Sequence, residues 1–186
     1  MAKLIYSAFT SLDGYVADET GNFDWAELGE EVHAFINNRE KQVGTYLLGR
    51  KMYETMAVWE TPDVLSFLPA AALGFVPIWK AAEKIVYSTT LQTVSMARAW
   101  LERTFDADVI RELKAAATRD LAIGGPALAA HAIRSGLVDE YNLLIAPVIA
   151  GGGNPYLPGE VRVKLELFDE RRFDNGLIHV RYRAKS

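Results

Sequence analysis

The pattern of apolar and polar positions is clearest within residues 120–153. Residues 121–123 form an apolar run that is too short for a helix and is typical of a buried strand. A helix is predicted from Pro126, because apolar residues then recur at helical spacing, and Gly136 is expected to end it. Residues 141–150 are nearly all apolar and predict a strand buried on both faces of a parallel sheet. Together these elements predict a βαβ unit with a right-handed crossover.

The same patterns predict further elements on both sides of this unit. Strands are expected at residues 3–10, 15–17, 45–48 and 84–87, and helices at residues 24–37, from Met52 onward and at 109–117. In the first helix Asp24 is the expected N-cap, and the apolar stripe is Leu28, Val32, Phe35 and Ile36. In the third helix Val109 and Ile110 are expected to point inward.

Two segments differ from these regular elements. Residues 61–80 combine three prolines with many large apolar residues, which predicts short helical pieces in an irregular connection. Residues 161–168 and 177–182 alternate apolar and polar positions, and the Asp-Asn-Gly sequence at 174–176 is a strong hairpin signal. We therefore predict one α/β domain over residues 1–186. Its central, mostly parallel sheet would be flanked by helices on both faces and would end in an antiparallel hairpin.

Composition narrows the range of partners. The chain has 186 residues, a length that suits one domain with a full hydrophobic core. Its net charge of -4 argues against a nucleic-acid or membrane-surface partner, because binding to either generally requires a basic patch. The sequence has no cysteine, which excludes disulfides and Cys-ligated zinc and agrees with a reducing, cytoplasmic location. No apolar run is long enough to span a membrane. We expect a small-molecule ligand and no metal.

Three predicted strand ends carry residues suited to a nucleotide. They are Gly49-Arg50-Lys51, Ser88-Thr89-Thr90 and Gly124-Gly125. Each has a simpler interpretation, as solvated surface charge, as turn and cap residues, or as a tight turn. Ligands of open α/β sheets bind at the carboxyl ends of the strands, so the three together predict a nucleotide site. A G-x-G-x-x-G motif after the first strand and a P-loop motif are both absent from the sequence.

The order of these motifs resembles the dihydrofolate reductase-like fold. More narrowly, the chain resembles the reductase domain of the bifunctional riboflavin-biosynthesis deaminase-reductase and its stand-alone bacterial relatives. The matching stretches are SLDGYVA at 11–17, GRK at 49–51, KIVYSTTL at 84–91, IGG at 123–125, GLVDE at 136–140, and Pro147 followed by GGG at 151–153. A zinc deaminase half would need histidine and cysteine motifs that this chain lacks. The resemblance therefore extends to the reductase half alone.

The resemblance implies NADPH as the cofactor. The residues that would contact it are Gly49, Arg50, Lys51, Ser88, Thr89, Gly124, Gly125, Ala127 and Leu128. Arg50 and Lys51 would lie by the phosphates, and Ser88 and Thr89 near the adenosine 2′-phosphate. The others would follow the pyrophosphate and the nicotinamide. Cations and hydroxyls suit a 2′-phosphate, whereas NAD recognition usually uses an acidic residue.

Two carboxylates are candidates for the catalytic role. Asp13 corresponds to the aspartate of the S-x-D-G motif in riboflavin-type reductases, which lies beside the substrate. Glu31 and Phe35 resemble the helix carboxylate and aromatic that hold the pteridine in dihydrofolate reductases, and their spacing puts them on one side of a helix. Asp13 could instead bond its own turn, and Glu31 could be helix-surface charge. Basic residues for a substrate phosphate, Arg171, Arg172 and Arg181, are candidates only by charge.

Three functions follow from these observations. The first is an NADPH-dependent reductase acting on a heterocyclic or sugar-linked substrate, resembling 5-amino-6-(5-phosphoribosylamino)uracil reductase of riboflavin biosynthesis. The alternatives are dihydrofolate reduction and, from another class, a non-catalytic nucleotide- or flavin-binding module. The resemblance also implies a homodimer. Its contact would be either the apolar residues 64–79 or the edge of the final hairpin, unless residues 64–79 instead fold over the pocket of a monomer.

Overall fold

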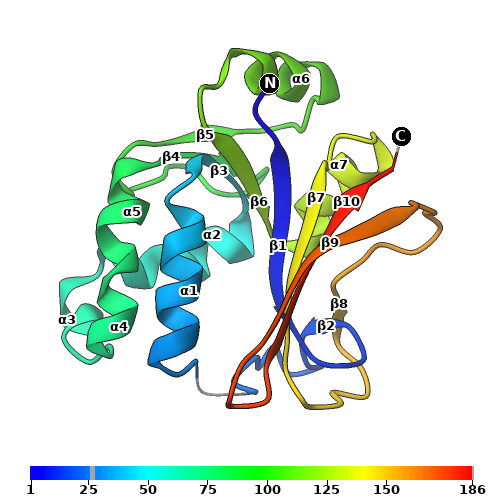
Figure 1. Ribbon diagram of the computed structural model, residues 1–186. Coiled ribbons are helices and arrows are strands. Elements are labelled where there is room, and N and C mark those ends of the chain that lie inside the picture. The colour runs from blue at the N-terminus through cyan, green and yellow to red at the C-terminus, as the bar shows by residue number, and fades with distance from the viewer. Residues whose placement is uncertain (26–27, 186) are drawn as a thin grey trace.

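Eight strands of the described residues form one central sheet (Figure 1). The computed structural model describes residues 1–25 and 28–185. The strands of the sheet are β1 (Leu4–Thr10), β3 (Val43–Gly49), β4 (Glu83–Tyr87), β5 (Ala99–Glu102), β6 (Asp120–Gly124), β7 (Glu140–Ile145), β9 (Leu165–Arg172) and β10 (Ile178–Ala184). Their order is β5-β4-β3-β6-β1-β7-β10-β9. Neighbours from β5 to β7 are parallel, and the pairs β7–β10 and β10–β9 are antiparallel. The predicted mostly parallel sheet with a C-terminal antiparallel pair is confirmed.

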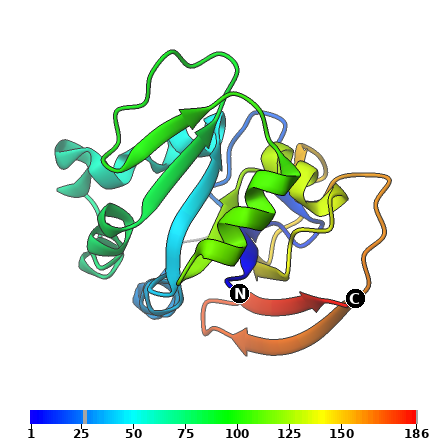
Figure 2. The same ribbon diagram turned by 90° about the horizontal axis from the view of Figure 1, so that it is seen from above.

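Helices cover both faces of this sheet (Figure 2). They are α1 (Glu30–Glu40), α2 (Arg50–Met56), the 3-10 helix η1 (Ala57–Glu60), α3 (Pro62–Leu65), α4 (Ala70–Leu73), α5 (Phe75–Ala81), α6 (Ala107–Ala116) and α7 (Pro126–Arg134). The alternation of side chains along β3 explains the two layers. Leu47 belongs to the core cluster that includes residues of α6 and α7, whereas Tyr46 and Leu48 belong to the cluster under α2 and α5.

The predicted βαβ unit is β6, α7 and β7. The strand β1 lies between β6 and β7 in the sheet, so the connection passes over one strand. Pro126 lies in the first turn of α7, where its missing N–H is no loss. Gly136 follows the helix with φ +64°, and its N–H donates to the Ile133 carbonyl while Leu137 donates to Ala132. This is the glycine-ended helix terminus that the sequence predicts.

The C-terminal hairpin forms at the predicted turn. The N–H of Phe173 donates to the Leu177 carbonyl at 3.0 Å, and Gly176 takes a φ of +85°, a conformation that favours glycine. The strand β9 begins at Leu165, later than the predicted position 161. The reason is that its partner β10 ends at Ala184, opposite Leu165, so earlier residues have no strand to pair with.

The helix predicted over residues 24–37 begins and ends later. Asp24 is not its N-cap, because α1 starts at Glu30. A polar turn uses the preceding residues instead: the Asp18 carboxylate accepts the N–H of Asn22, whose side-chain oxygen accepts the N–H of Asp24 at 3.0 Å. Part of the predicted helix, residues 26–27, lies outside the described residues.

Several smaller expectations also need correction. The strand predicted over 141–150 ends at Ile145, because Pro147 has no N–H to continue the pairing. The edge strand β5 has only short alternation, and the sequence patterns miss it. Val109 was expected to point inward but is 54% exposed, and its neighbour Ile110 is fully buried.

Residues 61–80 form the short helices α3, α4 and α5, as predicted. Phe75 and Trp79 are buried in the core, whereas Phe67 is 87% exposed. A separate small sheet pairs β2 (Tyr15–Ala17) with β8 (Asn154–Pro155). Among the helices of the described residues, none is both long and apolar enough to cross a bilayer.

Candidate functional site

The three nucleotide-type motifs lie at the ends of neighbouring strands. Because β4, β3 and β6 are adjacent and parallel, their carboxyl ends share one edge of the sheet. Leu48 pairs with Gly124, and Gly49 pairs with Tyr87, the residue before Ser88. A side-chain carbon on Gly49 would lie 3.8 Å from the Gly124 carbonyl oxygen. The predicted convergence of these three motifs is therefore a feature of the fold.

The backbone conformation at one position and close packing at the other favour glycine in the pair at the end of β6. Gly125 has φ +96°, and a side-chain carbon on Gly124 would meet Met52 Cγ at 2.9 Å. Gly125 is also the N-cap of α7, so the first N–H groups of that helix, which have no partner within it, face this edge. Ala127 is exposed there, while the Leu128 side chain is buried in the core. Only the backbone of Leu128 is therefore suited to ligand contact.

Hydroxyls and cations gather beside β4. Arg50 donates to Thr90 Oγ1 at 2.7 Å and to Glu54 at 2.8 Å, and Lys51 next to it is exposed. The Ser88 hydroxyl accepts the N–H groups of Thr90 and Leu91 and thereby shapes the turn.

Arg103 joins this group, although the sequence patterns do not single it out. It donates to the carbonyls of Ser88 and Leu91 at 3.0 and 2.5 Å. Thr89, the residue after Ser88, is exposed. The cluster presents three cations and exposed hydroxyls on one rim, a combination suited to a phosphate.

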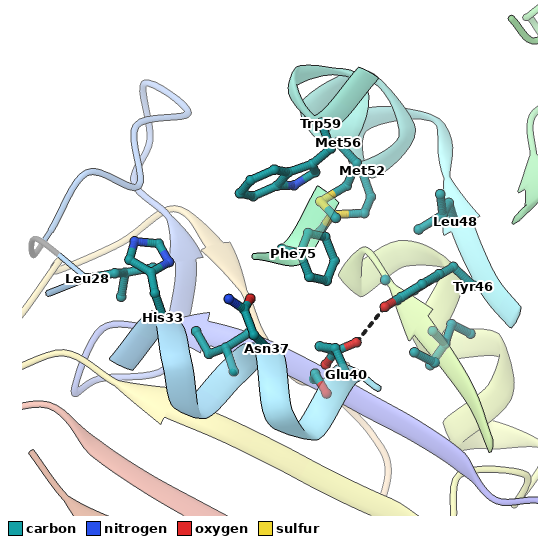
Figure 3. Close-up of a pocket in the computed structure, with 15 residues that line it drawn as sticks. Leu28, His33, Asn37, Glu40, Tyr46, Leu48, Met52, Met56, Trp59 and Phe75 are labelled. Carbon is teal, nitrogen blue, oxygen red and sulfur yellow. Dashed lines mark hydrogen bonds between the residues drawn. The ribbon is translucent and has the colours of Figure 1, made fainter. Parts of the chain in front are cut away.

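A pocket of about 250 Å³ opens beside the glycine pair (Figure 3). On one side α1 contributes His33, Ile36, Asn37 and Glu40. The sheet contributes Ser7, Tyr46, Leu48 and Gly124, and the helices opposite α1 contribute Met52, Met56, Trp59 and Phe75. Leu28 also lines the pocket, from a position just before α1 rather than within it. The walls are mostly apolar and aromatic, as in ligand pockets generally.

The polar groups inside the pocket come mainly from one face of α1. His33, Asn37 and Glu40 are four and three residues apart, so they share a side of the helix. Tyr46 donates its hydroxyl proton to Glu40 at 2.7 Å. Burial raises the pKa of Glu40, and burial followed by the Glu40 charge raises the pKa of Tyr46. A carboxyl with a raised pKa inside a pocket is a candidate acid or ligand-orienting group.

Sequence reasoning did not single out Glu40 or Tyr46. The signal that could have found Glu40 is the polar spacing at 33, 37 and 40, whereas Tyr46 lies on β3 and has no such signal. That stripe runs beside the apolar stripe that predicts the helix.

Asp13 lies outside the residues that line this pocket. Its carboxylate oxygens accept the N–H groups of Ala150 and Gly151 at 2.9 and 2.8 Å. Hydrogen bonds from the Ser11 side chain and from these amides lower the pKa of Asp13 to about 2. The carboxylate therefore ties two loops together, and its proposed contact with substrate stays a prediction.

Glu31 and Phe35 share one side of α1, as their spacing predicts, but this side faces the hairpin. Glu31 pairs with Arg171 at 2.6 Å, and the Arg171 guanidinium lies 5.2 Å from the Phe35 ring centre. Phe35 also packs edge-on against Phe173 and His179. Neither Glu31 nor Phe35 lines the pocket. Their predicted substrate roles stay predictions, and the geometry places Glu40 nearer to any ligand there.

Cationic candidates for a substrate phosphate lie elsewhere as well. Arg181 pairs with the fully buried Glu140 at 2.5 Å, and Arg171 is engaged by Glu31. Among the described residues that line the pocket, none is arginine or lysine. Across residues 1–25 and 28–185, no three acidic or histidine side chains are grouped to hold a metal ion.

The sheet order and the strand-end site define a dihydrofolate reductase-like α/β protein. The structure is similar to that of dihydrofolate reductase from Enterococcus faecalis in complex with NADP(H) and RAB-propyl. The TM-score is 0.60 at 14% identity, over 99% of this chain and 97% of that one. Within this class, the chain belongs to the RibD C-terminal domain family, whose model matches residues 2–179. Membership in this family indicates a reductase-like role.

Three further proteins are similar to this chain over nearly its whole length. A Shewanella sp. PV-4 structure with a provisional riboflavin-biosynthesis name is similar over the full length of both chains, with TM-score 0.78 and 22% identity. The Thermotoga maritima diaminohydroxyphosphoribosylaminopyrimidine deaminase/5-amino-6-(5-phosphoribosylamino)uracil reductase gives 0.66 at 16% identity, over 99% of this chain and 57% of that one. YyaP of Bacillus subtilis (strain 168), a protein of uncharacterized function, is 26% identical over 97% of this chain and 94% of its own.

Proposed function

We propose that the protein is an NADPH-dependent reductase that delivers hydride to a neutral heterocyclic substrate. One observation carries the proposal. Three neighbouring strand ends place a cationic, hydroxyl-rich rim next to a glycine turn, and that turn opens into an apolar pocket. The family of the chain and the NADP(H) complex of a protein with a similar fold support the same conclusion.

The residues of the edge suit this cofactor. Gly124 and Gly125 leave room for close approach of a pyrophosphate to the backbone, and the first turn of α7 would face its negative charge. Arg50 and Thr89 would meet the adenosine 2′-phosphate, and Arg103 adds a cation beside them. Bound NADPH would supply the hydride, while the protein orients the reactants and excludes water.

The pocket favours a flat, uncharged substrate. Its volume of about 250 Å³ lies just under the usual range of roughly 300–1,000 Å³ for ligand pockets, which suits a ring system. The aromatic and thioether walls suit the faces of such a ring. A phosphoribosyl group is not favoured, since arginine and lysine are missing from the described lining. Glu40 would hydrogen-bond the ring and could supply the proton that accompanies hydride transfer.

The alternative of dihydrofolate reduction relied on Glu31 and Phe35. Because both face the hairpin rather than the pocket, no observation favours it over a general heterocycle reductase. A non-catalytic binding module would share the cofactor site and differ only in turnover.

We also propose a homodimer that uses the hairpin edge. The strand β9 ends the sheet with an open edge, and its Leu167 is 45% exposed. Residues 64–79 are less suitable, because Phe75 is buried and lines the pocket.

Coenzyme titration tests the proposed function. NADPH should bind at least about tenfold more tightly than NADH, a difference of ~1.4 kcal/mol. Arg50→Ala should remove most of this preference and leave NADH affinity unchanged. Arg111→Ala is the matched control, because Arg111 is a helix arginine with a similar short-range carboxylate partner and similar exposure, 54% against 50%.

Turnover is the second readout. A screen of pteridines, deaminated ribosylaminopyrimidines and flavins, followed by NADPH oxidation, should identify a substrate. Equal affinities for NADPH and NADH in the wild type would refute the assignment of the rim. Coenzyme binding without turnover of any of these compounds would favour the non-catalytic module.

A further inference from the structure

A line of three polar side chains crosses the sheet beneath α1 and ends at the pocket. Ser7 of β1 lines the pocket, and Asn142 Nδ2 of β7 donates to Ser7 Oγ at 3.1 Å. His179 Nε2 of β10 is hydrogen-bonded to Asn142 Oδ1. The three side chains thus form a continuous chain of hydrogen bonds from a buried imidazole to the wall of the pocket.

Apolar side chains make up much of the surroundings of these three residues, although the charges of Arg39, Asp169 and Arg171 also act on His179. His179 is only 3% exposed, and its ring lies 4.6 Å from the ring centre of Phe35. Phe35 in turn packs against a core cluster that includes Val32 and Leu144. Burying polar groups here costs free energy unless each is hydrogen-bonded, so an apolar strip would be the simpler core. We therefore expect these hydrogen-bonded side chains to have a function, and Ser7 is the member that can contact a ligand in the pocket.

The direction of the hydrogen bonds follows from the histidine. Within the described residues His179 Nδ1 is buried and has no partner. An orphaned buried N–H is rarer than an orphaned acceptor, so the proton lies on Nε2 and Nδ1 carries the lone pair. His179 then donates to Asn142 Oδ1, which fixes the amide, and the amide N–H donates to Ser7.

With the hydrogen bonds in this direction, the hydroxyl proton of Ser7 is directed at a ligand in the pocket. Because Ser7 Oγ already accepts a hydrogen bond from Asn142, its own O–H is free to donate into the pocket, next to Gly124. The absence of arginine and lysine from the described lining argues against an anionic acceptor. A neutral carbonyl oxygen is the partner that suits a single hydroxyl donor in such a place.

We propose that Ser7 recognises an amide-type carbonyl oxygen of a bound molecule, and that Asn142 and His179 are positioning residues that hold Ser7 as a donor. This inference rests on the proposed function, which brings two such oxygens to the pocket. One belongs to the nicotinamide carboxamide, and the other to a ring carbonyl of the substrate.

The first experiment needs no ligand. Nitrogen NMR of ¹⁵N-histidine-labelled protein at pH 7, with His179→Gln used to assign the signal, reports which ring nitrogen carries the proton. The neutral Nε2–H form is expected. The Nδ1–H form would reverse the chain, direct an acceptor at the pocket, and overturn the inference.

The second experiment measures binding of three probes to the wild type and to Ser7→Ala. NADPH carries the carboxamide, 2′-phospho-ADP-ribose lacks the nicotinamide, and lumazine carries ring carbonyls. Ser7→Ala should weaken one of the two carbonyl-bearing probes about tenfold and leave 2′-phospho-ADP-ribose unchanged. Loss confined to NADPH would identify the carboxamide as the partner, and loss confined to lumazine would identify the substrate ring.

Two further variants separate donation from packing. Ser7→Thr keeps the hydroxyl and should restore binding, whereas Thr10→Val removes a hydroxyl of the same strand outside the pocket and should have no effect. If the wild type binds NADPH or lumazine and Ser7→Ala binds them equally well, the role of Ser7 is refuted and the proposed function stands. If the wild type binds neither, both proposals fail.

Discussion

His179 lies on β10 with 3% of its surface exposed, and burial lowers its pKa from 6.5 to about 4. The charged groups around it are Arg39 and Arg171, which disfavour its protonation, and Asp169, which favours it. In the unfolded chain the imidazole takes up a proton as the pH falls through 6.5. The folded protein resists this until about pH 4. The stability contributed by the neutral imidazole is therefore complete above pH 6.5 and is lost as the pH falls towards 4.

The size of this effect follows from the two pKa values. At pH 5 the unfolded histidine is almost fully protonated and the folded one is mostly neutral, so His179 should reduce the free energy of unfolding by about 2 kcal/mol relative to pH 8. Urea unfolding followed by circular dichroism at the two pH values measures it. His179→Gln keeps a donor for Asn142 but cannot titrate. This variant should lose about 2 kcal/mol less than the wild type between pH 8 and pH 5.

Other groups contribute equally to both proteins and cancel in this comparison. The low pKa of Asp13, about 2, affects stability only below the chosen range. His131→Gln, which changes an exposed histidine on α7, should leave the wild-type loss unaltered. If His179→Gln lost as much stability as the wild type between the two pH values, His179 would not be a buried neutral side chain. The hydrogen-bond order inferred from it would then be wrong.

Three further predictions concern the carboxylates and the oligomeric state. Once a substrate is identified, Glu40→Gln should lower turnover about a hundredfold with NADPH affinity kept, whereas Glu31→Gln should leave both near wild type; the reverse result would restore the dihydrofolate reductase pattern. Asp13→Asn keeps one acceptor instead of two, so hydrogen exchange of the Ala150 and Gly151 amides should quicken, and unchanged protection would remove its loop-tying role. Light scattering should give twice the 20.6 kDa mass of the chain, reduced by Leu167→Glu and not by Phe67→Glu; a wild-type mass near 20.6 kDa would refute the dimer.

The strand ends of the cofactor site could be predicted because their signals are local. An apolar run followed by Gly49, or by Gly124 and Gly125, indicates where a strand stops and a helix begins, and parallel pairing then brings the ends together. The pocket could not be found in this way. Apart from the sheet, its walls come from α1, α2, η1 and α5, and the faces that these helices turn towards one another depend on tertiary packing.

The two sides of α1 illustrate the same limit. Spacing alone shows that Glu31 and Phe35 share a side, but their partner Arg171 lies 140 residues after Glu31 in the hairpin. Glu40 lies on the side that meets Tyr46 and the pocket. The spacing of residues in a helix shows which of them share a side, but it does not show which part of the fold that side contacts.

The most direct test of the cofactor site is a crystal structure of the protein with NADP⁺. We predict the adenosine 2′-phosphate within hydrogen-bonding distance of Arg50, the pyrophosphate against the backbone of Gly124 and Gly125, and the nicotinamide at the mouth of the pocket beside Ser7. A coenzyme bound at another edge of the sheet, or with its adenosine end in the pocket and its nicotinamide outside, would contradict this prediction.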